Sequence, residues 1–130
     1  MAAAAAEPVS TAPHLALGRA AEVAAARHLE RLGYRIITTN FRARGGELDL
    51  VALDGDALAI VEVRYRACDR YGGAAASITH GKRTRIIRAA RALLATNPPL
   101  AKLPARFDVV EVSGSPDDLH CNLIRGAFSL

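Results

Sequence analysis

The stretch GELDLVALDGDALAIVEVRYR, residues 46–66, decides the fold. It contains two runs rich in aliphatic and β-branched residues, 47–53 and 58–66, which Asp-Gly-Asp separates. Asp-Gly between two apolar runs is a strong hairpin signal, because glycine adopts the positive φ that tight turns need. The stretch therefore predicts two antiparallel strands that a short turn joins.

The register of this hairpin decides which acidic side chains meet. A four-residue loop over 54–57 pairs Leu53 with Leu58 and places Asp49 directly opposite Glu62 on one face of the sheet. A two-residue loop would leave the two acids diagonal to each other, and a three-residue loop would put them on opposite faces. We favour the four-residue loop, because even-numbered loops also keep the apolar side chains of both strands together.

Sequence on both sides of the hairpin predicts two helices and more strands. Apolar residues recur at helical spacing in 15–32 and again in 82–95. The side chains predicted to face the core are Ala21, Ala25, Leu29 and Leu32 in the first helix and Ile86, Ala90, Leu93 and Leu94 in the second. Further strands are predicted over 34–39 and 107–112, with a short last strand over 123–128 and loops over 40–46, 67–80 and 113–118. The order αβββαβ, with this final strand, predicts an α/β domain whose central mixed sheet is flanked by helices.

Length and composition exclude several classes of protein. The 130 residues make one domain, predicted over 15–130 after a disordered tail over 1–14. Two cysteines form at most one disulfide, so the chain is not a disulfide scaffold. No apolar run approaches the roughly 20 residues of a membrane helix. The tail lacks the basic start of a signal peptide, so we expect a cytoplasmic protein with no membrane partner.

Basic residues are concentrated in one part of the chain. Residues 64–91 contain eight basic residues and a single acidic one, and arginine supplies 15 of the 17 basic residues in the whole sequence. The planar guanidinium suits phosphate, so this segment predicts contacts with nucleic acid. The predicted contacts are Arg66, Lys82, Arg85 and Arg88 of this segment, together with Arg42 and Arg44 of the loop over 40–46. The competing interpretation is the biased composition of an alanine-rich chain.

Asp49 and Glu62 suggest a metal site. Cross-strand neighbours have Cβ atoms about 4.5–5.5 Å apart, and two carboxylates at that distance repel unless a cation binds between them. Mg²⁺ or Mn²⁺ would suit such oxygen ligands, with water and phosphate completing the shell. Arg64, two residues on from Glu62, would project to the same side. The pattern predicts metal-assisted cleavage of a phosphodiester, while a solvated or salt-bridged strand face remains the alternative.

Segments along nearly the whole chain, from about Leu17 to Phe128, resemble the YraN family of small bacterial proteins. The matching pieces are Gly18, Glu22, Gly33-Tyr34, Asn40, Arg42, GELDL (46–50), VEVRYR (61–66), Tyr71-Gly72-Gly73, Lys82, RFDVV (106–110) and Ala127-Phe128. That family is assigned to the restriction-endonuclease-like, or PD-(D/E)xK, nuclease superfamily. The resemblance implies its αβββαβ core, with metal held by Asp49 and Glu62. By analogy with archaeal Holliday-junction resolvases, Glu22 would complete the acidic cluster.

One position departs from the superfamily signature, because Arg64 stands where that signature ends in lysine. Arginine does not lose its proton, so Arg64 could clamp a phosphate oxygen but could not act as a base. Water would then be deprotonated with the help of the metal or of Glu47. Lys82 could substitute for the missing lysine, although a lysine at a helix start is more often simply solvated.

These features lead to three expectations about function. The first is a Mg²⁺- or Mn²⁺-dependent endonuclease acting on structured or branched DNA, for which a homodimer would suit cutting of two strands. The second is a non-catalytic nucleic-acid-binding module that retains the nuclease fold, and the Arg64 departure favours it. The third is a protein-interaction subunit of a DNA repair complex.

Overall fold

The computed structural model describes residues 13–66 and 79–128, with side chains from Leu17 onward. Its elements are α1 (Pro13–Arg31), β1 (Arg35–Ala43), β2 (Gly46–Asp54), β3 (Ala57–Arg66), α2 (His80–Thr96), α3 (Pro98–Ala101), β4 (Ala105–Ser115) and β5 (Asp118–Phe128). The predicted order of helices and strands is confirmed, apart from the additional short helix α3. Residues 1–12 of the predicted tail and most of the predicted loop over 67–80 lie outside the described residues.

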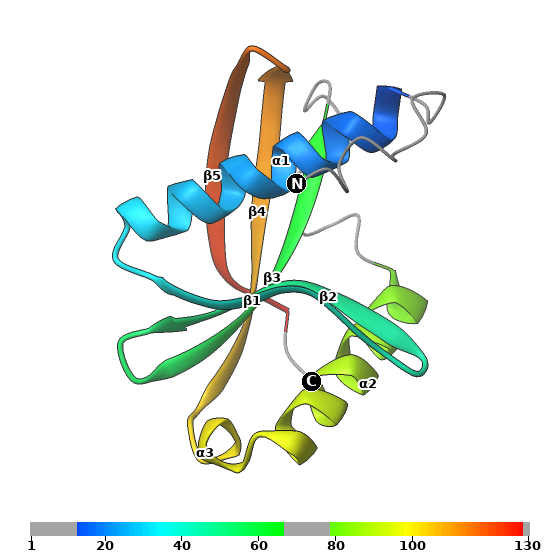
Figure 1. Cartoon of the computed structure of the whole chain (residues 1–130), viewed down its shortest axis with the longest axis vertical. Helices are drawn as coiled ribbons and strands as arrows, with labels where there is room; N and C mark the ends of the chain where they lie inside the picture. Colours follow the sequence, from blue (N-terminus) through cyan, green and yellow to red (C-terminus); the bar gives the residue numbers. More distant parts are fainter. Residues whose placement is uncertain (1–12, 67–78, 129–130) are drawn as a thin grey trace, which may run out of the picture.

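The five strands form one mixed sheet in the order β1-β2-β3-β4-β5. The first three are an antiparallel meander, β4 runs parallel to β3, and β5 returns antiparallel to β4. Figure 1 shows α1 crossing in front of β3, β4 and β5, whereas α2 lies beside the β1–β2 hairpin. The parallel pair requires the long crossover that α2 provides, so the predicted mixed α/β class is confirmed.

The predicted register of the central hairpin is confirmed, and the predicted length of its loop is wrong. Leu53 lies opposite Leu58, as expected. Asp54 and Ala57 also pair, so the turn consists of only Gly55 and Asp56, with Gly55 at a φ of 62°. The turn is shorter than predicted because strand pairing continues one residue further into the Asp-Gly-Asp segment.

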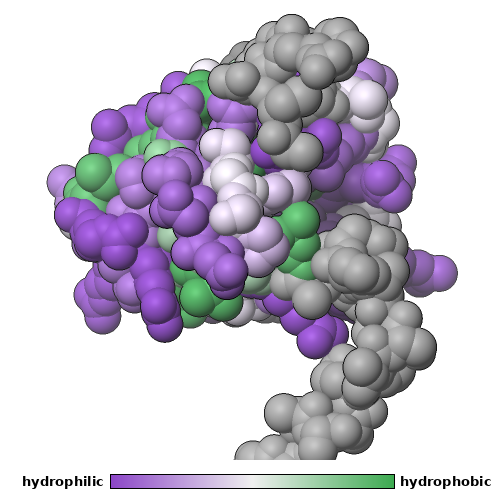
Figure 2. Space-filling model, turned by 90° about the horizontal axis from the view of Figure 1, so that it is seen from above, coloured by the Kyte–Doolittle hydropathy of each residue, from purple (hydrophilic) through white to green (hydrophobic). Residues whose placement is uncertain are grey.

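The core consists of two clusters, one on each face of the sheet. On the α2 face, Leu58 and Ile60 of β3 pack with Ile86 and Leu93 of the helix. On the α1 face, the buried side chains are Ala21, Ala25, Leu29, Tyr34, Leu50, Ala52, Ala59, Val61, Val110 and Val112. Leu32 is not among them and is 48% exposed, because α1 ends at Arg31 and the chain turns there. The face seen in Figure 2 is mostly hydrophilic, with apolar side chains in small separate areas.

The alternation of side chains along β2 breaks at Asp49. Leu48 and Val51 both pack in the α2 cluster, whereas Leu50 packs in the α1 cluster. Opposite this point on β1 stands Asn40, whose φ of 51° makes it the one described non-glycine residue in the left-handed region. Asparagine tolerates this conformation better than most residues. The pairing of β2 with β3 begins only at Leu50, so Asp49 lies just before it, where the two strands separate.

The two edge strands are longer than predicted. β1 continues through residues that were expected to form a loop, and β5 begins five residues before its predicted start at 123. Both carry exposed polar side chains at alternate positions, since an edge strand faces water on more than one side. Because these parts of β1 and β5 are rich in polar residues, their sequence did not predict strands. The short helix α3 was not predicted either; it begins at the Pro-Pro pair that ends α2.

Candidate functional site

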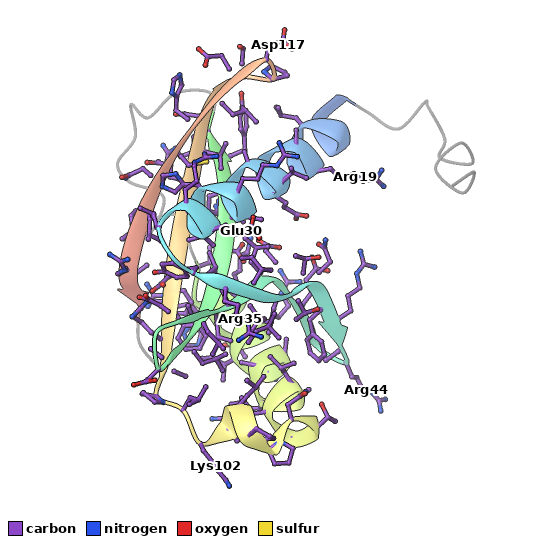
Figure 3. The ribbon with its side chains drawn as sticks, turned by 60° about the vertical axis from the view of Figure 1, so that its left-hand side comes forward. Arg19, Glu30, Arg35, Arg44, Lys102 and Asp117 are labelled. Atoms are coloured by element: carbon purple, nitrogen blue, oxygen red, sulfur yellow. The ribbon has the colours of Figure 1, made fainter. Side chains whose placement is uncertain are left out.

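A cleft of about 700 Å³ lies between the β1–β2 hairpin, β3 and the start of α2. Its lining residues are Arg42, Ala43, Gly45, Gly46, Glu47, Asp49, Glu62, Lys82, Arg85, Ile86 and Arg88. Four of the six predicted nucleic-acid contacts are therefore in one place. The other two are not in this lining: Arg44 points away from the tip of the hairpin in Figure 3, and Arg66 lies on β3.

Two glycines allow the hairpin to close against α2. A side chain at Gly46 would clash with the carbonyl oxygen of Arg85, so the two backbones are in direct contact. Gly45 has a φ of 90°, and a Cβ there would lie 3.3 Å from the Cδ atom of Arg88. Only glycine combines this conformation with such a close approach. The Gly-Gly pair, which was predicted simply as part of a loop, therefore fixes one wall of the cleft.

The carboxylates of Asp49 and Glu62 meet at the foot of the cleft. Asp49 Oδ2 accepts a hydrogen bond from the backbone N–H of Val63 at 2.9 Å, which holds Asp49 against β3. Glu62 is only 6% exposed. Burial, followed by the negative charge of Asp49, raises the pKa of Glu62 to about 7. The juxtaposition of these two acids agrees with the register expected from the sequence.

Lys82 partly offsets this unfavourable pair. Its Nζ atom lies 2.5 Å from Oε2 of Glu62, and this contact lowers the pKa that burial and Asp49 raise. The Thr79 side chain caps α2 by accepting a hydrogen bond from the backbone N–H of Lys82 at 3.1 Å, so the helix begins where the lysine can reach β3. The expectation that Lys82 is simply solvated is therefore wrong.

Arg64 does not join the cleft, in contrast to the expectation that it converges with the two acids. It is half-buried on β3, and its register partner is Glu111 of the parallel strand β4. Arg66 lies in the same region, with its Nε atom 3.7 Å from Oε2 of Glu111. Sequence spacing placed Arg64 on the correct face of the strand. It did not show that the cleft ends before that residue.

Glu22 and Glu47 lie on different sides of Asp49. Glu47 lines the cleft and is exposed, with Oε1 3.7 Å from Nε of Arg42. Glu22 belongs to α1 and lines a separate cavity on the other face. Burial and the charge of Asp49 raise the pKa of Glu22, while a hydrogen bond with the Asn40 side chain lowers it. Glu22 is thus close enough for its charge to interact with Asp49.

The acidic side chains form a pair rather than a larger metal cage. Within residues 13–66 and 79–128, no three His, Cys, Asp or Glu side chains gather closely enough to hold a metal ion by themselves. Asp49 and Glu62 nevertheless offer carboxylate oxygens beside an open cleft. Mg²⁺ commonly binds through one or two carboxylates and takes its remaining ligands from water and phosphate. The two carboxylates therefore fit a hard divalent cation that takes only part of its ligands from the protein.

A second buried carboxylate, Asp108 of β4, belongs to a network away from the cleft. Its oxygens accept hydrogen bonds from Arg106 Nε at 2.8 Å, Arg106 Nη2 at 2.9 Å, the Tyr34 hydroxyl at 3.1 Å and the Gly126 N–H at 3.0 Å. Arg106 also donates to Asp54 at 2.8 Å. These contacts tie β2, β4 and β5 together.

Fold and site together define a mixed α/β protein in which a buried glutamate, Glu62, and the half-buried Asp49 lie at the foot of a basic cleft. Residues 21–112 match the model of a family described as Uncharacterised protein family UPF0102. A UPF0102 protein of Xanthomonas campestris is 53% identical over 113 residues, covering 87% of this chain and 91% of the relative. One from Xylella fastidiosa is 50% identical over 113 residues, covering 87% and 92%. The chain belongs to the UPF0102 family, the YraN-like family that its sequence resembles.

The match includes the elements that build the cleft. It begins in α1 just before Glu22 and continues through the hairpin, β3 and α2 to the end of the buried part of β4. None of the helices in the described ranges is long and apolar enough to cross a membrane.

Proposed function

We propose that the protein is a metal-dependent nuclease of the restriction-endonuclease-like superfamily that cleaves a phosphodiester bond in structured or branched DNA. The observation that carries the proposal is the pair of Asp49 and Glu62 at the foot of a cleft with basic walls. A buried carboxylate beside a second negative charge is costly unless a cation is bound, and a basic cleft is suited to a polyanion. The αβββαβ order of the fold supports the superfamily placement.

Each group of residues has a distinct part in this proposal. Asp49 and Glu62 would hold Mg²⁺ or Mn²⁺, which when bound activates water and neutralises charge on the phosphate. Arg42, Arg85 and Arg88 would position the phosphate backbone without reading its sequence. Lys82 provides a point charge next to Glu62, which Arg64 does not. Glu47, exposed on the cleft wall, would accept a proton.

The test is cleavage of branched, flapped and linear DNA in the presence of Mg²⁺ or Mn²⁺. We expect the wild-type chain to cut at least one of these substrates and Asp49→Asn to lose at least about 100-fold in rate, as expected for a residue that holds the metal. Asp56→Asn is the matched control, because this acid lies exposed in the turn of the same hairpin. Wild-type protein that cuts none of the substrates, or an Asp49→Asn variant that cuts equally well, would exclude the nuclease.

A second candidate function is a nucleic-acid-binding module without catalysis. The ion pair between Lys82 and Glu62 favours it, because this contact compensates the buried acid without any metal. This candidate predicts DNA binding that needs no divalent cation, weakens steeply with salt and survives Glu62→Gln. Fluorescence anisotropy of labelled DNA at two salt concentrations, with and without EDTA, distinguishes it from the nuclease.

A further inference from the structure

We propose that Lys82 competes with the metal for Glu62, so that the divalent cation and nucleic acid bind cooperatively. In the free protein Lys82 forms an ion pair with Glu62. When a phosphate binds in the cleft, Lys82 pairs with the phosphate instead, and both Asp49 and Glu62 can then bind the cation. This inference rests on the proposed function, since it concerns the regulation of the same site.

The competition follows from the position of the ammonium group. Lys82 Nζ lies 2.5 Å from Oε2 of a glutamate that has little access to water. A divalent cation bound to the same oxygen would face a positive charge at close range, and two like charges in a partly dehydrated site repel strongly. The lysine and the metal therefore compete for Oε2 of Glu62 in this arrangement.

The Lys82 side chain can move away from Glu62, and a phosphate in the cleft would give it another anionic partner. Its side chain is 33% exposed, in contrast to the buried acid, and lysine carries its charge on a flexible four-carbon stem. Arg85 follows one turn later on α2 and lines the same cleft. A phosphate near these two side chains would therefore bind two positive groups on one helix face, and it would offer Lys82 an alternative anion.

The charges of the site couple the binding of metal to the binding of nucleic acid, and this coupling is reciprocal. With Lys82 in place, the ion pair cancels one of the two negative charges that Asp49 and Glu62 offer to a metal. When the lysine turns to phosphate, both negative charges are available to the cation. Any gain in metal affinity that the nucleic acid causes must equal the gain in nucleic-acid affinity that the metal causes. Couplings of this kind are typically about 5- to 150-fold.

Calorimetric titration of the full chain with Mn²⁺ tests the inference, with and without a saturating phosphorothioate DNA oligonucleotide. At about pH 8 the metal competes with few protons for the ligands. We expect the oligonucleotide to raise the Mn²⁺ affinity of the wild type by about 5- to 150-fold. Lys82→Met should bind Mn²⁺ tightly without DNA and lose most of this coupling. Arg88→Met is the matched control, which should weaken DNA binding but keep the coupling.

The possible outcomes separate the inference from the proposed function. If the wild type and Lys82→Met bind Mn²⁺ equally well without DNA, the metal site stands and the competition by Lys82 is refuted. If neither the wild type nor any variant binds Mn²⁺, the proposed function fails and the inference fails with it. Lys82→Gln and a thermal unfolding curve for each variant ensure that a lost signal does not come from a misfolded chain.

Discussion

The described chain buries two carboxylates, Glu62 and Asp108, in very different surroundings. Asp108 accepts four hydrogen bonds, from Arg106, the Tyr34 hydroxyl and the Gly126 N–H. A buried carboxylate that accepts several hydrogen bonds, including some from a guanidinium, is stable in its charged form. The network around Asp108 is therefore a structural feature that joins β4, β5 and Tyr34, the residue just before β1.

Among the residues that the structure describes, Glu62 has one cationic partner, Lys82, and a second carboxylate beside it. Its environment opposes the charged form, as its raised pKa indicates. Strongly perturbed acids tend to cluster at functional sites, because the fold tolerates the local cost in exchange for chemistry. The contrast between the two acids shows that the surroundings of a buried carboxylate, rather than its burial, distinguish a structural residue from a candidate site residue.

The largest effect that we predict is on Asp108. Asp108→Asn removes the charge that compensates Arg106, and we expect the free energy of unfolding to fall by about 3–5 kcal/mol, which is typical of a broken buried pair. Urea denaturation measures this loss. Asp54→Asn is the matched control, because Asp54 also contacts Arg106 but is 29% exposed, and it should cost only about 0–1 kcal/mol. Equal losses in the two variants would contradict the assignment of Asp108 as a buried structural anchor.

Glu62 should show an intermediate effect that depends on pH. Its pKa is raised from 4.5 to about 7 in the folded state, so between these values the folded chain binds more protons than the unfolded chain. The contribution of Glu62 to stability is therefore complete below pH 4.5 and is lost as the pH rises through about 7.

The variant Glu62→Gln stays neutral and should not show this decline. We expect it to gain on the order of 2–3 kcal/mol relative to the wild type as the pH rises across that interval. Urea denaturation across this pH range measures the difference, with the exposed Glu30→Gln as control. Parallel stability curves for wild type and Glu62→Gln would mean that Glu62 is not held in an unfavourable charged state.

The smallest effect concerns the hydroxyl group of Tyr34. This group donates to Asp108 and accepts from Arg106 and Arg125, each at 3.0 Å. Tyr34→Phe leaves the ring in the core and keeps the pair of Asp108 with Arg106, so we expect a loss of about 1 kcal/mol. Thermal or urea unfolding measures it. A loss as large as that of Asp108→Asn would show that the hydroxyl, rather than the ion pair, holds the network together.

The sequence predicted the order of the elements and the register of the central hairpin. Both follow from local rules, since Asp-Gly marks a turn and the period of apolar residues separates helix from strand. The juxtaposition of Asp49 and Glu62 also follows from that register. These predictions needed no knowledge of how the helices pack.

What the sequence did not show depends on packing between distant elements. The contact of Lys82 with Glu62 depends on how α2 lies against the sheet, and 19 positions separate the two residues along the chain. The break in alternation at Asp49 was also not foreseen, although Asn40, a residue that tolerates positive φ, was a signal for it. The position of Arg64 outside the cleft was not predicted either. Spacing along a strand predicts which face of the sheet a side chain is on, but it does not predict where along the strand the cleft ends.

The parallel pairing of β3 with β4 has a consequence for the order of folding. Asp49 and Glu62 come together within a hairpin that is local in sequence, so this contact can form early. Lys82 reaches Glu62 only when the crossover helix docks, a step that closes a long loop and is therefore slower. We expect the nascent hairpin to keep its two acids hydrated until α2 arrives, so that docking of the helix is the step that removes Glu62 from most of its contact with water.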